Sequence, residues 1–309
     1  MVLLAEQGGK EHFFSHVQLR GSMPFIWKQS PDMRWSPKVT IHPSDKLNSD
    51  IIAKNYGDIK KSYENCTLVN LVDRKGSQGR LGEYFNKMHN TVEDEGMRLV
   101  WFDFHAECKN MKYENLSKLL DQLQHEVENY GYFYIEMPKA DKDSERPQRK
   151  MAQKGIFRTN CMDCLDRTNV VQSVFARQLM LTWLSKLGIA NRGRGGSAFE
   201  KLPDSLEEIF RSHWTKNADA VSILYSGTPA MKTDFTATGK RTTRGALNDG
   251  YFGAKRWFLG NFYDARDQDY IDFSLGKIKP KKSKAEVIRH STCNAVYVLV
   301  ILVLLYLYR

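Results

Sequence analysis

The chain has 309 residues, of which 41% are apolar and 27% charged, and this balance excludes a disordered or collagen-like protein. Its net charge of +10 predicts an anionic partner, either an acidic membrane surface or a nucleic acid. The five cysteines are few and odd in number, which favours a reducing, cytosolic setting over a secreted, disulfide-built protein. The basic residues form no platform with interleaved aromatic side chains, so we expect no nucleic-acid partner.

The first half of the chain alternates between predicted strands and helices. Residues 66–72 (CTLVNLV) and 99–105 (LVWFDFH) are short runs of branched and aromatic residues, a composition typical of buried strands. The spacing of four apolar residues between them predicts a helix: Leu81, Tyr84, Phe85 and Met88. A leucine stripe from Leu116 to Val127 predicts a second helix, with Gly131 as its C-cap.

The alternation continues through the middle of the chain. Residues 131–136 (GYFYIE) predict another strand. Residues 138–154 predict a basic surface loop, either a plain solvated connection or a lip that guides a phosphorylated substrate. A long helix is predicted over residues 166–187, and another begins near Asp204 with Glu207 as its capping-box partner. Together these elements predict an α/β fold with a mixed sheet flanked by helices.

The carboxyl end contains a candidate membrane segment. Residues 291–308 carry no charge and are mostly apolar, but a spanning helix needs about 20 apolar residues. We therefore expect an incomplete transmembrane helix, with a buried core segment as the alternative. The basic stretch before it places the preceding part in the cytosol and is attracted to anionic lipid. The predicted domains are a catalytic part (1–275), a basic linker (276–292) and a membrane segment (293–309).

The segment with the most chemical content is RTNCMDCLDRT, residues 158–168. It places Cys161 and Arg167 with five residues between them, after an apolar stretch and at the start of a predicted helix. An arginine fork binds two phosphate oxygens, and the backbone N–H groups of a turn and a helix start bind the others. The same positive environment lowers a thiol pKa, so that the cysteine attacks as a thiolate. We therefore predict a Cys-x5-Arg phosphate-binding loop between a strand and a helix.

Each residue of this loop has a predicted role. Cys161 is the nucleophile and forms a phosphocysteine that water then hydrolyses. Arg167 binds the phosphoryl oxygens, and the Thr168 hydroxyl donates to the thiolate or to the leaving sulfur. The remaining members, which supply backbone N–H groups from Met162 onward, are Asn160, Met162, Cys164, Leu165 and Asp166.

A general acid must also protonate the leaving alkoxide, because an alkoxide is a poor leaving group. Asp163 is the favoured candidate, and Asp166 lies in the same loop. Asp103 and His105, at the end of an earlier predicted strand, are supporting candidates. For each aspartate the alternative role is to orient the loop or Arg167.

The spacing of Cys161 and Cys164 permits two other interpretations. A zinc site needs two further ligands, and no second pair with metal-ligand spacing occurs among the other cysteines and the eight histidines. We therefore expect no metal and no other cofactor. A thioredoxin-like redox pair is the second alternative, although the flanking arginines suit phosphate better.

Residues 158–172 (RTNCMDCLDRTNVVQ) closely resemble the signature of the Sac-domain phosphoinositide phosphatases. Further blocks resemble the same family in order along residues 15 to 275: 20–29 (RGSMPFIWKQ), Asn70-Leu71 with Gly82-Glu83, 102–108 (FDFHAEC), 217–228 (NADAVSILYSGT) and 231–264. The resemblance implies metal-free dephosphorylation of phosphatidylinositol monophosphates, notably the 4-phosphate. It also implies that Cys161 is the nucleophile and Arg167 the phosphate-binding residue.

The resemblance also includes the apolar segment at the carboxyl end. The apolar end is similar to the subgroup anchored in the endoplasmic reticulum and Golgi, which implies a catalytic part that faces the cytosol and acts on phosphoinositide head groups at an anionic membrane surface. Family members carry a further portion before the RGSMPFIW block, and the anchored subgroup has two membrane segments. We therefore expect this chain to be truncated at both ends. Two other functions stay open: a non-catalytic phosphoinositide-binding or tethering protein, and a phosphoprotein phosphatase with the same loop.

Overall fold

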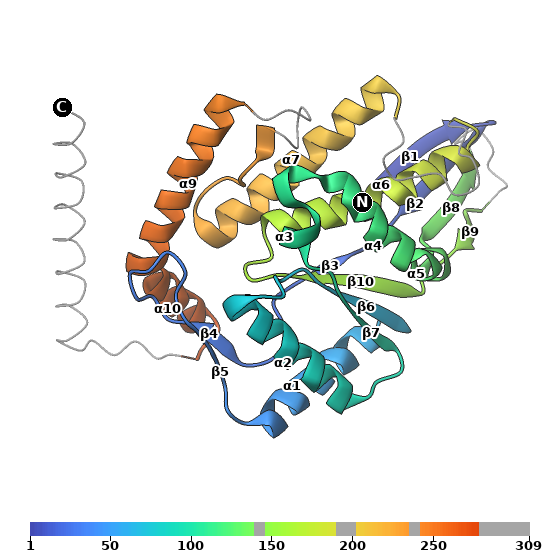
Figure 1. Ribbon diagram of the computed structural model, residues 1–309. Helices are drawn as coiled ribbons and strands as arrows, with labels where there is room; N and C mark the ends of the chain where they lie inside the picture. Colours follow the sequence, from blue (N-terminus) through green and yellow to red (C-terminus); the bar gives the residue numbers. More distant parts are fainter. Residues whose placement is uncertain (139–145, 190–201, 235–241, 278–309) are drawn as a thin grey trace.

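The fold is built around a parallel sheet that lies between two layers of helices (Figure 1). The computed structural model describes residues 1–138, 146–189, 202–234 and 242–277. All neighbouring strands of this sheet are parallel, in the order β3 (Leu19–Arg20), β10 (Gly155–Asn160), β6 (Asn65–Asn70) and β7 (Met97–Trp101). The α/β class and the presence of strands near residues 66 and 99 are therefore confirmed.

Side chains of the central strands point alternately to the two helical layers. Leu68 and Ile156 pack against α1 and α2, whereas Val69 and Phe157 belong to the core on the opposite face. The first layer consists of α1 (Asp45–Lys60) and α2 (Gly76–Val92). The second consists of α4 (Ser117–Gln122), α5 (Gln124–Tyr130) and α6 (Asp166–Lys186).

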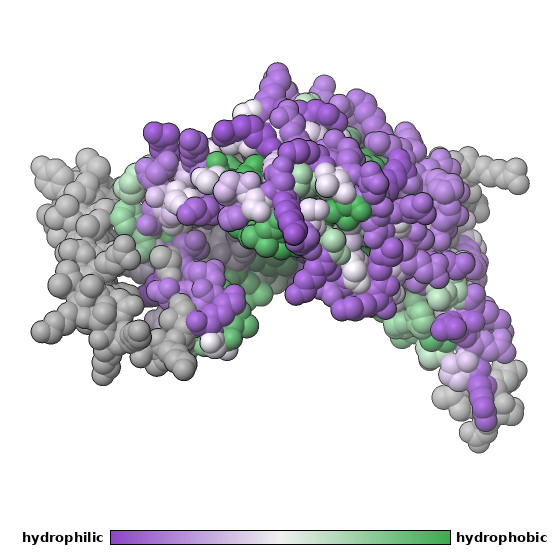
Figure 2. All heavy atoms as spheres, turned by 90° about the horizontal axis from the view of Figure 1, so that it is seen from below, coloured by the Kyte–Doolittle hydropathy of each residue, from purple (hydrophilic) through white to green (hydrophobic). Residues whose placement is uncertain are grey.

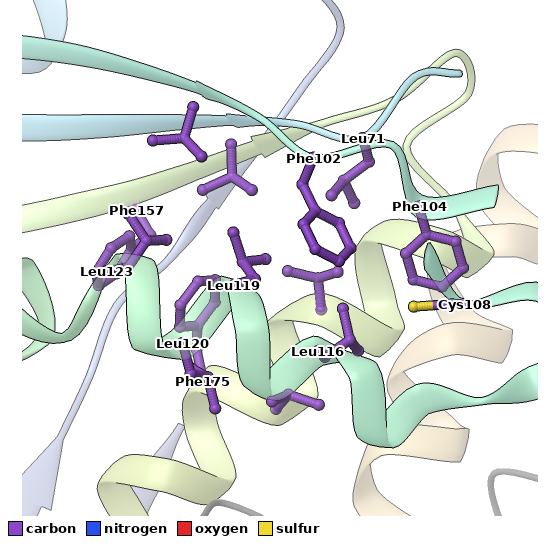
Figure 3. Packing of buried hydrophobic residues seen from close by; sticks show 14 of the residues in the cluster. Leu71, Phe102, Phe104, Cys108, Leu116, Leu119, Leu120, Leu123, Phe157 and Phe175 are labelled. Carbon is purple, nitrogen blue, oxygen red and sulfur yellow. The ribbon is translucent and has the colours of Figure 1, made fainter. Parts of the chain in front are cut away.

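The hydrophobic core beside α4 and α6 holds β10 and α6 together, on either side of residues 160–166 (Figure 3). Phe157 of β10 stacks on Phe175 of α6, with ring centroids 4.6 Å apart and planes 11° from parallel. Leu119 and Leu123 are buried in the same cluster. Burial of each such side chain contributes about 2 kcal/mol, so the strand before the loop and the helix after it are packed as one unit.

Gly155, the first residue of β10, permits a close approach in this core. A Cβ at this position would lie 2.2 Å from the ring of Tyr130, which is closer than real side chains pack. The Tyr130 hydroxyl is hydrogen-bonded to Thr67 of β6 at 2.7 Å. Glycine therefore lets the end of α5 lie directly on the start of the strand that leads to Cys161.

A second, antiparallel sheet corrects the predicted mixed sheet. Its order is β1 (Val2–Gln7), β2 (Lys10–Ser15), β8 (Phe133–Pro138) and β9 (Gln148–Met151). The predicted strand at 131–136 is thus present but belongs to this sheet. Part of the predicted basic loop forms β9, and residues 139–145 of it lie outside the described residues. Trp183 of α6 stacks on Phe14 at 5.3 Å and joins the two sheets.

The remaining elements lie mainly at one end of the molecule. They are the hairpin β4 (Trp27–Gln29) with β5 (Val39–Ile41), the helices α3 (Phe104–Glu107), α7 (Asp204–Ser226), α9 (Thr243–Phe262) and α10 (Asp264–Ser274), and two 3₁₀ turns, η1 (Lys109–Met111) and η2 (Tyr113–Leu116). Seen from below, the surface is mostly hydrophilic, with separate hydrophobic patches (Figure 2). No helix within the described ranges has both the length and the apolar character to cross a bilayer. The predicted linker and membrane segment lie outside these ranges from residue 278 onward.

Three local predictions are corrected. The strand predicted to reach residue 105 ends at Trp101, because the Asp103 carboxylate caps α3 by accepting the N–H of Ala106 at 3.0 Å. The leucine helix is divided into α4 and α5 at Leu123. Glu207 does not form a capping box. It pairs with two arginines instead, Arg177 at 2.6 Å and Arg211 at 2.5 Å.

Candidate functional site

The segment from Asn160 to Asp166 leaves the carboxyl end of β10 and enters α6. Ligand sites of open parallel sheets form at this edge, where strands end and helices begin. Cys161 is the first residue after the strand, and its side chain is almost fully buried, at 1% exposure. The structure therefore has the strand–loop–helix arrangement that the sequence pattern predicts around Cys161.

The Cys161 sulfur lies among donors from its own loop. The Cys164 N–H donates to it at 3.2 Å, and the buried Thr168 hydroxyl lies 3.7 Å away. In return, the Cys161 N–H donates to the Cys164 sulfur at 3.4 Å. Cys164 has a φ of +55°, which is uncommon for a residue other than glycine. This left-handed turn brings both backbone donors and both sulfurs together, and strain of this kind clusters at functional sites.

The two thiols titrate as a pair. The hydrogen bond from the Cys161 side chain lowers the pKa of Cys164 to about 7, against the effect of its burial. The same hydrogen bond raises the pKa of Cys161, and burial and the nearby Asp163 raise it further. As the pH rises through about 7, the pair therefore gains one negative charge, which rests on Cys164 while Cys161 keeps its proton.

Arg167 points towards the turn between β6 and α2. Its Nη1 donates to Asp73 Oδ1 and to Gln78 Oε1, both at 3.0 Å, and lies 3.5 Å from the Leu71 carbonyl oxygen. The Arg167 side chain is 30% exposed, so a ligand from solvent has access to it. Arg167 also lines a small cavity of about 40 Å³ together with Phe104, Tyr113, Asp166 and Lys232.

The candidate acids have different environments. Asp163 is exposed, and its Oδ1 accepts both the Cys161 thiol at 3.4 Å and the Leu165 N–H at 3.2 Å. Asp166 is half-buried and accepts the Met231 N–H and the Arg256 guanidinium, and burial raises its pKa. Only Asp163, of these two, contacts the thiol.

The two supporting candidates lie on another element. Asp103 accepts two backbone N–H groups, those of Ala106 and Arg74, so its carboxylate is committed to capping. His105 is exposed on the short helix α3. Asn160, at the end of β10, is fully buried and donates to the Asn70 side chain at 2.7 Å. Met162 packs partly against the α1–α2 core, and Leu165 is buried at the start of α6.

Two arginines outside the predicted loop face it from β3 and β10. Arg20 donates to the Gln172 side chain at 2.7 Å and to the Cys164 carbonyl at 3.4 Å. Arg158 is buried and donates to the Ser22 carbonyl at 2.6 Å, and its charge helps to lower the pKa of Cys164. Both residues lie in the sequence blocks described above, residues 20–29 and 158–172, and these blocks are the signal that could have identified them.

Within the described ranges, no three His, Cys, Asp or Glu side chains lie close enough to hold a metal ion. Cys161 and Cys164 are free thiols in this structure. The site is therefore a cysteine-centred loop at the carboxyl edge of a parallel sheet, with arginines on neighbouring elements.

Comparison with known proteins places this architecture in a family. Residues 1–109 match the family model of the SacI homology domain. The chain is 41% identical over 261 residues to the phosphatidylinositol-3-phosphatase SAC1 of Drosophila melanogaster, an alignment that covers 84% of this chain and 42% of that protein. It is 37% identical over 262 residues to the phosphoinositide phosphatase SAC6 of Arabidopsis thaliana, covering 85% and 42%.

The budding yeast phosphatidylinositol-3-phosphatase SAC1 is 36% identical over 282 residues, covering 90% of this chain and 44% of the yeast protein. The chain thus spans about two-fifths of the length of the relatives that it matches. The chain belongs to the Sac-domain family.

Proposed function

We propose that this protein hydrolyses the phosphate monoester of phosphatidylinositol monophosphates, most readily the 4-phosphate, at Cys161. The observation that carries the proposal is the position of the Cys161 sulfur, which accepts the Cys164 N–H and the Thr168 hydroxyl between a strand end and a helix start. The similarity to relatives named as phosphoinositide phosphatases supports this substrate class. The names of the fly and yeast relatives specify the 3-phosphate, so the isomer has to be tested directly.

The reaction that we propose has two steps. Cys161 first passes its proton to the Cys164 thiolate, and the new Cys161 thiolate attacks phosphorus. An S–P bond forms while the P–O bond to inositol breaks, and Asp163 in its protonated form gives a proton to the leaving alkoxide. Water then gives a proton to the Asp163 carboxylate and attacks the phosphocysteine, so that the S–P bond breaks and inorganic phosphate and the Cys161 thiolate are released. Arg167 and the loop N–H groups carry the phosphoryl charge in both steps.

We propose that this reaction takes place at the cytosolic face of endoplasmic reticulum and Golgi membranes. The net charge of +10 supports contact with an anionic surface. Phosphoinositide head groups on that surface are the proposed partners, and the chemistry requires no metal or other cofactor.

The test is phosphate release from vesicles that contain phosphatidylinositol 4-phosphate, with phosphatidylinositol 3-phosphate vesicles as the isomer arm. We expect Cys161→Ser to abolish release on both substrates. Equal release by wild type and Cys161→Ser would exclude Cys161 as the nucleophile. The buried Cys161 of raised pKa also favours a non-catalytic lipid-binding protein, which vesicle binding without any phosphate release by wild type would indicate.

A further inference from the structure

The guanidinium of Arg167 is held from one side only. All its acceptors contact the same nitrogen, Nη1: Asp73 Oδ1 and Gln78 Oε1 at 3.0 Å, and the Leu71 carbonyl oxygen at 3.5 Å. Within the described part of the chain, no acceptor is within hydrogen-bond distance of Nη2 or Nε. A guanidinium binds an oxyanion through a pair of N–H groups, and the Nη2–Nε edge is such a pair.

The residues that hold Nη1 are themselves fixed. The Asp73 N–H donates to Gln78 Oε1 at 3.2 Å, which turns the amide oxygen towards the turn and towards Arg167. The Leu71 N–H donates to the Asn160 carbonyl at 2.8 Å, and the Asn160 side chain donates to Asn70 at 2.7 Å. The turn that carries Asp73 is therefore tied to the last residue of β10, directly before Cys161.

We propose that Asp73, assisted by Gln78, is a positioning residue that orients Arg167 for the phosphoryl group. This inference rests on the proposed phosphatase function. Asp73 holds Nη1 against the β6–α2 turn and leaves the Nη2–Nε edge for two phosphate oxygens. Because this turn is tied to the strand end before Cys161, the arginine and the thiol keep one relative position. Without Asp73, the long arginine side chain samples several rotamers, and each productive encounter with phosphate carries an entropic cost.

Stability alone does not account for this arrangement. The Arg167 and Asp73 side chains are 30% and 27% exposed, and ion pairs of such exposure add little to the stability of a fold. The pair has a useful counterpart at the opposite end of the same sheet. There Lys60 and Asp94 form an ion pair of 2.9 Å, with Asp94 21% exposed, outside the proposed site. Asp94→Asn is therefore a matched control for Asp73→Asn.

The experiment compares Asp73→Asn and Gln78→Leu with Asp94→Asn and wild type. The kinetic readouts are kcat and KM on phosphatidylinositol 4-phosphate vesicles, and calorimetry measures the affinity of orthovanadate, an inorganic phosphate analogue. We expect Asp73→Asn to lower kcat/KM and to weaken vanadate binding by about tenfold each. Gln78→Leu should act in the same direction with a smaller effect, and Asp94→Asn should match wild type. In an Arg167→Lys background, Asp73→Asn should lower kcat/KM and vanadate affinity by less than about twofold each, because both changes affect one interaction.

The other outcomes are decisive as well. Unchanged vanadate affinity in Asp73→Asn would overturn the positioning role. Higher activity of Asp73→Asn than of wild type would also overturn it, since Asp73 would then restrain Arg167 in a resting position. If wild type releases no phosphate, the proposed function fails, and the vanadate affinities still decide whether Asp73 orients Arg167 for an oxyanion.

Discussion

The shared proton between Cys161 and Cys164 leads to a prediction about how activity depends on pH. The side-chain hydrogen bond with Cys161 lowers the pKa of Cys164 to about 7, so the single negative charge of the pair forms near that pH. Attack by Cys161 needs this charge. The reactive fraction therefore rises about tenfold between pH 6 and pH 8 and changes little above pH 8.

Cys164→Ser removes the group that accepts the proton from Cys161. Cys161 must then ionise alone, in a site where burial and Asp163 raise its pKa above the ordinary value of 9.0. In wild type about three quarters of the pairs carry one charge at pH 7.5, whereas in Cys164→Ser most of Cys161 keeps its proton at that pH. We expect kcat/KM at pH 7.5 to fall by about tenfold or more and to keep rising with pH up to 9.

The assay is phosphate release from phosphatidylinositol 4-phosphate vesicles between pH 5.5 and pH 9.5. The rate at which iodoacetamide alkylates Cys161 over the same range reports the thiolate without any substrate. Cys108→Ser is the control, because Cys108 is a buried thiol in the core beside α4. A Cys164→Ser profile that still levels off near pH 8 would refute the proton transfer, and the alkylation profile would then show whether Cys161 ionises on its own.

Two further predictions concern stability. His16 is fully buried, and burial, followed by the nearby N-terminal charge, lowers its pKa from 6.5 to about 4. The unfolded chain binds this proton more readily, so the contribution of His16 is present above pH 6.5 and is lost as the pH falls towards 4. At pH 5 the loss is about 2 kcal/mol, and urea unfolding at pH 7.5 and pH 5 should show it in wild type but not in His16→Phe. Equal pH dependence of the two would contradict this. The second prediction concerns Arg256, which donates to Ser222 and Thr228 and pairs with Asp166 at 3.3 Å. Arg256→Met should lower the free energy of unfolding, measured by thermal unfolding, by about 3 kcal/mol, because it leaves the half-buried Asp166 carboxylate without its ion pair. Lys255 is exposed, so Lys255→Met should change this free energy little.

Two strands of the parallel sheet, β6 and β7, could be predicted because their signals are local. Each is a short apolar run, and α2 and α6 show helical spacing within a few turns. The antiparallel sheet could not be predicted in the same way. β2 pairs with β8, so that Lys10 lies opposite Pro138, and neither segment carries a signal of a partner so distant in the chain. The helices α9 and α10 could not be predicted either, because the glycines of α9 and the many polar residues of α10 mask their periodicity.

The candidate site was predictable to a similar degree. A cysteine after an apolar run and an arginine at a helix start are neighbours in sequence, so their motif is visible. The partner of Arg167 is not visible in this way, because Asp73 lies 94 residues away. For Asp103 the sequence suggested a chemical role, and the structure shows a structural one. Its place after a strand suggested chemistry, but an aspartate before a helix is also a common N-cap, and its two backbone hydrogen bonds show that capping prevails here.

The reactive loop depends on segments that lie on both sides of residue 109, where the match to the SacI homology domain ends. Cys161, Cys164 and Arg167 come from the later part, whereas Arg20, Asp73 and Gln78 come from the earlier part. The earlier part also provides β3 and β6, which flank β10 in the sheet. Neither part alone brings a thiol together with an oriented arginine. Under the mechanism that we propose, substitutions in the first 109 residues therefore change catalysis without any change in the signature, most directly at Asp73.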